Sequence, residues 1–311
     1  MRSVMGLSRG RAFGVALFAA LAAGCHQELR PVRVGVTRID LIGPRFLPRW
    51  EPLRLDLGLY LGPGRLLQFE VLTPRQIRVH LSTGREAFAL VNAAEYAEVV
   101  RGGDATVLAT AVNAAGNTER VGLIVTGVGS PIQSLADLKG KRFDFGPKGD
   151  PLLDTAAVCA LARAGVNLSD IEKDRLLGRY HHIGSLEVAR AVVYKNVPAG
   201  IVDAAEYEKW PAHGGSFLLG TVSRDQLRVL YRTEPVPEMA VVASKRADPA
   251  LVEKVRKYFL EDINRKQLAV LSWLGVNGFV AADADRYAPF TKEVNEVYPP
   301  ASQPEETPVE P

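Results

Sequence analysis

The sequence predicts an α/β protein of two domains. Short runs rich in β-branched residues alternate with helix-patterned stretches along most of the chain. A chain of 311 residues, 47% of them apolar, is long enough to form two packed cores. In addition, one strand-to-helix pattern occurs twice, once in each half of the chain.

The expected elements follow from these patterns in order. Strands are predicted over Val32–Thr37, Ala87–Val91, Thr106–Val112, Val121–Thr126, Arg142–Gly146, Ala199–Val202 and Met239–Ser244. Helices are predicted over Ala93–Val100 and Pro151–Ala164, with others starting at Ala204 and after the Asp248-Pro249 cap. Because helical stretches separate most of the strands, we expect the sheets to be mostly parallel.

The first 24 residues have the pattern of a secretory signal peptide. Three arginines precede the apolar run Ala12–Ala23. Twelve residues rise about 18 Å as a helix, which is too short to span a bilayer core of ~30 Å. The ending Leu21-Ala22-Ala23-Gly24-Cys25 resembles a bacterial lipobox, which implies a lipid on Cys25 and a short lipidated N-terminus at 25–29. The alternative is an ordinary cleaved signal.

Composition excludes several classes of protein. The balance of 38 Lys+Arg against 35 Asp+Glu lacks the excess of basic residues typical of nucleic-acid binders. Two cysteines cannot build a disulfide framework or a cysteine-rich zinc module. Cys159 lies in an apolar helical stretch and is predicted to be buried and unreactive. Residues 299–311, rich in Pro and Glu, are predicted to be a disordered tail.

The repeated pattern is Ala89–Tyr96 and Gly200–Tyr207. In each copy a strand ends at a capping side chain, Asn92 or Asp203, and a glutamate three residues later is expected to complete a capping box. Two interpretations remain open. Either two unrelated turns use the same capping chemistry, or the lobes are pseudo-symmetric and Asn92 and Asp203 face each other across the cleft, where α/β sheets bind ligands.

The stretch from Gly122 to Gly146, with its Ser-Leu-Ala-Asp-Leu-Lys-Gly-Lys run, resembles the crossover segment of type II periplasmic substrate-binding proteins. It is most similar to the phosphate/phosphite/phosphonate-binding family of ABC transporters. Further similarity covers the motifs VRVGVT at 32–37, PAGIVD ending at Asp203, LG at 274–275 and GFV at 278–280. Together these motifs span about residues 32–290.

This resemblance implies a hinged clamp of two doubly wound lobes with a ligand cleft between them. Lobe 1 would comprise residues 30–120 and 240–298, and lobe 2 residues 121–239. The implied protein is a periplasmic, membrane-anchored, monomeric lipoprotein that passes a small polar solute, phosphonate-like, phosphate-like or zwitterionic, to an ABC permease. No cofactor, metal or nucleic acid is expected. The alternatives are a ligand sensor, an orphan binding module for another solute and, with less support, an enzyme on the same fold.

The expected anion cradle departs from the family pattern. In the family, the loop after the Phe-Gly strand is rich in Ser and Thr, whereas residues 147–152 here contain Lys148, Gly149 and Asp150 and no hydroxyl group. Asp150 is placed to cap the following helix, where its carboxylate repels phosphate and Lys148 offsets part of the repulsion. The resemblance implies that Asp203 retains a position able to receive a ligand amino group.

Further candidate residues come from the family resemblance and from the distribution of charge. A family histidine aligns with Ser185, itself a plausible helix cap, while His181 and His182 fall in the preceding strand. Residues 30–85 contain ten arginines, which is either a solvated basic face or an attraction for anions. No catalytic motif is present. The predicted ligand-binding residues are Thr37, Arg38, Asn92, Lys148, Gly149, Asp150, Ser185 and Asp203.

Overall fold

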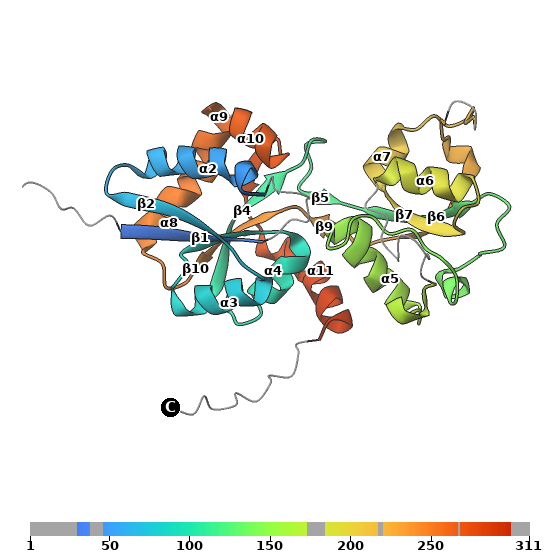
Figure 1. The fold of residues 1–311 in the computed structure, drawn as a ribbon, viewed down its shortest axis with the longest axis horizontal. Coiled ribbons are helices and arrows are strands. Elements are labelled where there is room, and N and C mark those ends of the chain that lie inside the picture. The colour runs from blue at the N-terminus through green and yellow to red at the C-terminus, as the bar shows by residue number, and fades with distance from the viewer. Residues whose placement is uncertain (1–29, 38–45, 173–183, 217–219, 267, 300–311) are drawn as a thin grey trace, which may run out of the picture.

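The computed structural model describes residues 30–37, 46–172, 184–216, 220–266 and 268–299. The predicted signal peptide, Cys25, Arg38, His181, His182 and the tail from residue 300 lie outside the described residues. Figure 1 shows two groups of elements at opposite ends of an elongated molecule, joined at its waist by β5 and β9.

The larger group is built on a six-stranded sheet with the order β11-β4-β10-β3-β1-β2. Its strands are β1 (Arg30–Val36), β2 (Arg65–Val71), β3 (Phe88–Val91), β4 (Ala105–Val112), β10 (Ala240–Ser244) and β11 (Gly278–Ala281). Strand β1 pairs in parallel with β2 and β3, whereas β10 and β11 are antiparallel to their neighbours.

Helices cover both faces of this sheet. One face packs on α2 (Phe46–Leu61), α8 (Pro249–Lys257), η5 (Tyr258–Asp262), α9 (Ile263–Lys266) and α10 (Leu268–Leu274). The other packs on α3 (Pro74–Thr83), α4 (Ala93–Val99) and α11 (Ala284–Val297). Adjacent strand residues point to opposite faces, so Phe88 and Leu90 face the first layer while Ala89 and Val91 face the second.

The smaller group is built on a three-stranded antiparallel sheet with the order β7-β6-β8. Its strands are β6 (Gly122–Gly127), β7 (Ala199–Asp203) and β8 (Leu227–Arg232). One face packs on the π-helical η2 (Pro151–Ala156) and α5 (Ala157–Arg163), and the other on α6 (Ser185–Val193). The remaining pieces are η1 (Leu135–Leu138), η3 (Leu168–Asp170), α7 (Ala204–Lys209) and η4 (Arg224–Gln226).

Two crossover strands connect the groups. Strand β5 (Glu119–Arg120) pairs antiparallel with β9 (Val236–Pro237), and they lie directly before β6 and β10 in the chain. Helix α11 also reaches both groups: Tyr287 packs in the core of the larger sheet, while Phe290 and Val294 join the core around α5. The joint therefore consists of two short strands and one long helix.

Two expectations about the sheets are wrong. The sheets are mostly antiparallel, because every pair of the smaller sheet and three of the five pairs of the larger one run in opposite directions. Residues 142–146 form only isolated bridges, from Arg142 to Glu172 and from Asp144 to Gly200, instead of a regular strand. A buried apolar run shows that a segment is extended, but it does not show its direction or its partner.

Candidate functional site

The ends of β1 and β3 meet at the first turn of α4. The buried Thr37 hydroxyl donates to Glu95 Oε2 at 2.7 Å, and the Asn92 N–H donates to the same oxygen at 2.8 Å. Asn92 Oδ1 in turn accepts the Glu95 N–H at 2.9 Å, so the predicted capping box is present. Burial raises the pKa of Glu95, although the bonds from Asn92 and Thr37 oppose the shift.

The loop that corresponds to the anion cradle satisfies its own backbone donors. Asp150 Oδ1 accepts the N–H groups of Leu152 and Leu153 at 2.8 and 2.7 Å, which confirms the predicted cap. Gly149 adopts φ +84°, a left-handed conformation that favours glycine, and donates its N–H to Asp154 Oδ2 at 2.7 Å. Two carboxylates therefore take three N–H groups that an anionic ligand would need.

The second copy of the repeated pattern is built differently from the first. Asp203 Oδ1 accepts the Ala205 N–H at 2.7 Å and caps α7, as expected. In a capping box, the Glu206 side chain would accept the Asp203 N–H. Here that N–H donates to Ser185 Oγ instead, at 2.9 Å. Gly184 is the N-cap of α6, so the prediction of Ser185 as a helix cap is wrong. Ser185 instead holds the end of β7.

Arg120, on the crossover strand β5, is the cation at the centre of this site. Its Nε lies 3.1 Å from Glu238 Oε1, and its Nη1 lies 3.9 Å from Asp203 Oδ2. Burial alone would lower the pKa of Arg120, but the carboxylates of Glu238, Asp150, Asp203 and Glu206 outweigh it and raise this pKa. Two carboxylates thus lie within ion-pair distance of the guanidinium group, and those of Asp150 and Glu206 act on it from further away.

The site draws on both groups of elements. Helix α4 contacts η2, and Ala93, next to Asn92, belongs to the same apolar cluster as Leu152 and Leu153, next to Asp150. Asp150 and Asp203 both act on Arg120. Lys148 is exposed at the loop. Chemically, the site is rich in hydrogen-bond acceptors and poor in free backbone donors.

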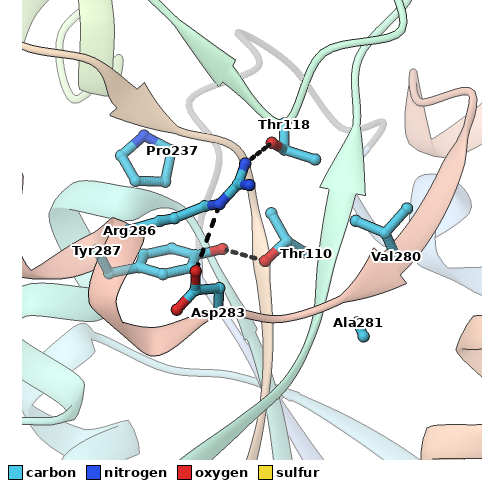
Figure 2. A pocket seen from close by; sticks show the side chains of 8 residues that line it. All are labelled: Thr110, Thr118, Pro237, Val280, Ala281, Asp283, Arg286 and Tyr287. Carbon is cyan, nitrogen blue, oxygen red and sulfur yellow. Dashed lines mark hydrogen bonds and ion pairs between the residues drawn. The ribbon is translucent and has the colours of Figure 1, made fainter.

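A cavity of about 210 Å³ lies beside the crossover strands, between β4, β11 and the start of α11 (Figure 2). The Tyr287 hydroxyl interacts with Thr110 Oγ1 at 3.0 Å, and Arg286 Nη1 donates to Thr118 Oγ1 at 3.1 Å. None of the predicted site residues lines this cavity. It adjoins the group of carboxylates around Arg120, because the Tyr287 hydroxyl donates to the Glu238 carbonyl oxygen at 3.0 Å.

Three residues of the site were absent from the sequence-based prediction: Arg120, Glu238 and Asp154. Arg120 and Glu238 are distant in the chain and meet through the pairing of β5 with β9. The available signal was position, because Arg120 lies on one strand that crosses between the two sheets and Glu238 directly follows the other. The prediction for Cys159 is confirmed in its burial, which raises the pKa of the thiol to about 12.

Comparison with known proteins identifies the family. The family model described as the periplasmic substrate-binding protein of phosphonate ABC transporters matches residues 44–287. The chain belongs to this family. It is thus a transporter substrate-binding protein and not an enzyme, and the family places it outside the cytoplasm, with a small solute and a membrane permease as partners. No curated protein matches the chain.

Solved structures show the same fold for this substrate-binding protein. XAC2383 from Xanthomonas citri, bound to ATP, is 19% identical with a TM-score of 0.63, over 86% of this chain and 98% of that one. PhnD1 from Prochlorococcus marinus, in complex with methylphosphonate, is 15% identical with a TM-score of 0.56, over 86% and 97%. The architecture is that of type II periplasmic binding proteins. Among the described residues, no helix is both long and apolar enough to cross a membrane.

Proposed function

We propose that this substrate-binding protein captures a small solute bearing a positively charged amino group, such as an aminoalkylphosphonate, and delivers it to an ABC permease. The solute sits between lobe 1 (residues 30–120 and 240–298) and lobe 2 (residues 121–239). The single observation that supports this most strongly is the group of carboxylates around Arg120, of which Glu238 lies at 3.1 Å and Asp203 at 3.9 Å. One guanidinium group cannot neutralise four carboxylates, and a ligand ammonium group supplies the missing positive charge.

The backbone N–H groups at the helix N-termini of the site are already capped by side chains, which argues against a simple phosphate ligand. Phosphate-binding sites use backbone N–H groups at helix N-termini. Here Asp150 occupies the N-terminus of η2, Asp203 that of α7 and Asn92 that of α4. A dianion at these positions would displace an internal hydrogen bond and meet the charge of Asp150 and Asp203.

Asp203 and Glu206 are the proposed receptors for the amino group. Asp203 uses Oδ1 as a cap, while Oδ2 faces Arg120 only at 3.9 Å, longer than a charge-assisted hydrogen bond of about 2.7–2.9 Å. Oδ2 is therefore available to accept from an ammonium group. The acidic end of a zwitterion is bound by Arg120 and Lys148.

The location of the protein is proposed in more detail from its N-terminus. Residues 1–24 direct export, and a lipid on Cys25 tethers a monomeric clamp to the membrane near its permease. The sequence from Leu21 to Cys25 supports this tether.

A thermal-shift screen tests the proposed ligand class. The purified chain is melted with 2-aminoethylphosphonate, ethylphosphonate, inorganic phosphate and ethylamine. Stabilisation follows RT ln(1 + [L]/Kd), about 2.7 kcal/mol at a hundredfold excess over Kd. The aminophosphonate is expected to raise the Tm most. Equal shifts for ethylphosphonate and the aminophosphonate would exclude recognition of the amino group.

A further inference from the structure

Three potential metal-ligating side chains meet outside the solute site. Glu70 lies on the edge strand β2, His80 near the end of α3, and Glu86 in the turn before β3. One nitrogen or oxygen atom from each lies within 4.8 Å of the other two. Two carboxylates and one imidazole form a donor set that suits zinc and related divalent ions.

Burial makes this cluster unusual. The side chain of Glu86 is 0% exposed, that of His80 15% and that of Glu70 28%. An ionised carboxylate that is removed from water needs a cation or several hydrogen bonds. Neither carboxylate oxygen of Glu86 has a well-aligned hydrogen bond. The cluster is open to solvent on the side of Glu70, which leaves an entry path for an ion.

His80 and Glu86 are in direct contact. His80 Nδ1 lies 2.7 Å from Glu86 Oε2, yet Nδ1 also lacks an aligned hydrogen bond. This is the distance of an ion pair between the carboxylate and a protonated imidazole. Zinc lies about 2.0–2.2 Å from nitrogen and oxygen ligands in tetrahedral geometry, so the two atoms must separate to about 3.4 Å when both bind one ion.

Glu70 places a second carboxylate beside Glu86. One oxygen of each carboxylate lies within 4.8 Å of the other, and the Glu86 side chain is fully buried. Two carboxylates this close repel each other, and a cation between them removes the repulsion. A bound cation satisfies both carboxylates and the imidazole at once.

Two arginines contact Glu70 from outside the cluster. Arg33 Nε lies 3.3 Å from Glu70 Oε1, and Arg85 Nη2 lies 3.7 Å from Oε2. Both distances exceed those of charge-assisted hydrogen bonds, about 2.7–2.9 Å. Each oxygen of Glu70 thus faces one arginine, so a metal ion that binds Glu70 must compete with these two ion pairs.

We propose that Glu70, His80 and Glu86 bind a divalent transition-metal ion of the zinc class. The ion ties the edge strand β2 to α3 and to the turn before β3, within the larger sheet group. This site is independent of the solute, because none of its three ligands is among the residues that act on Arg120.

Zinc titration of the full chain, purified without a histidine tag and stripped of metal, tests the proposal. Calorimetry should show one equivalent of Zn²⁺ bound, with a raised Tm. His80→Gln should weaken the Kd at least tenfold, since even outer partners of metal ligands contribute 10–100-fold. His213→Gln is the matched control, because His213 pairs with Asp225 at 3.0 Å on the surface, and it should bind as wild type does.

Glu70→Gln, on the partly exposed edge strand, provides a second variant in case His80→Gln does not fold. Its zinc affinity should also fall at least tenfold. Failure of the wild-type chain to bind one equivalent of Zn²⁺ would overturn the proposal, and so would unchanged affinity in a folded ligand variant. If the wild-type chain does not bind zinc and Glu86→Gln raises the Tm, the result would mean that Glu70 and Glu86 share a proton instead of a metal ion.

Discussion

Arg120 and Glu238 form an ion pair of 3.1 Å at the crossover of β5 and β9. Arg120 also faces Asp203, which ends β7 and is the N-cap of α7. The connection between the two sheets and the proposed receptor for a ligand amino group thus share one guanidinium group. Solute binding and the geometry of the β5–β9 crossover therefore depend on the same charged groups, those of Arg120, Glu238 and Asp203.

Removing that cation should destabilise the protein. In Arg120→Met, the carboxylates of Glu238 and Asp203 lose their partner in a site where the Arg120 side chain is 26% exposed. We expect the free energy of unfolding to fall by about 1–3 kcal/mol in urea denaturation. Arg286→Met is the control, because its pair with Asp283 is more than half exposed, and it should change stability by no more than about 0.5 kcal/mol. Equal losses in both variants would contradict a special role for Arg120.

Asp150 should exclude simple phosphonates. Asp150→Ser removes the negative charge but keeps a side chain able to cap η2. We expect methylphosphonate and phosphate to bind at least tenfold more tightly, or about 1.4 kcal/mol, by calorimetry. Asp137→Ser changes the charge equally at η1, where Asp137 accepts two backbone N–H groups, and should leave affinity unchanged. Wild-type affinity as high as that of Asp150→Ser would refute this role.

The buried Glu95 side chain should make the free energy of unfolding fall as pH rises. Burial holds its folded pKa above the usual 4.5, so the folded state retains a proton that the unfolded chain loses. The resulting stability is complete below pH 4.5 and is lost as pH rises through the folded pKa. In Glu95→Gln, a single oxygen can still accept from Thr37 and Asn92, since both donate to Oε2.

Urea denaturation across pH should therefore show equal stability for wild type and Glu95→Gln below pH 4.5. Above it, the variant should become the more stable of the two. Other buried acids contribute equally to both proteins, so the difference isolates Glu95. If Glu95→Gln is less stable than wild type at neutral pH, the hydrogen bonds from Thr37 and Asn92 must favour the ionised form of Glu95 over the protonated form.

The lipid tether is tested at Cys25. Cys25→Ala should move the protein from the membrane fraction to the soluble fraction after cell lysis, because the acyl chains supply the affinity for the bilayer. Cys159→Ala is the control, since that buried thiol is unsuited to modification, and it should stay with the membrane. Membrane partition of Cys25→Ala would disprove acylation at this residue.

Local chemistry explains which parts of the site were predictable. The caps at Asn92, Asp150 and Asp203 involve N–H groups two or three residues away, so the residue type and its place after a strand were sufficient. The helix of residues 151–164 was also anticipated, although its first turn is π-helical.

Contacts between distant segments were not predictable in the same way. The bond from the Asp203 N–H to Ser185 and the pair of Arg120 with Glu238 depend on how strands are ordered in the sheets. The antiparallel direction of the β7-β6-β8 sheet depends on the same ordering. Apolar patterning records burial but not strand direction, so parallel pairing was expected where antiparallel pairing occurs.

Calorimetric titration with 2-aminoethylphosphonate and ethylphosphonate tests the central claim, because the two compounds differ only in the amino group. We expect the wild-type chain to bind the aminophosphonate at least a hundredfold more tightly, about 2.7 kcal/mol, and Asp203→Asn to lose most of this preference. Equal affinity for both compounds, or an unchanged preference in Asp203→Asn, would contradict an acidic site built to receive an amino group.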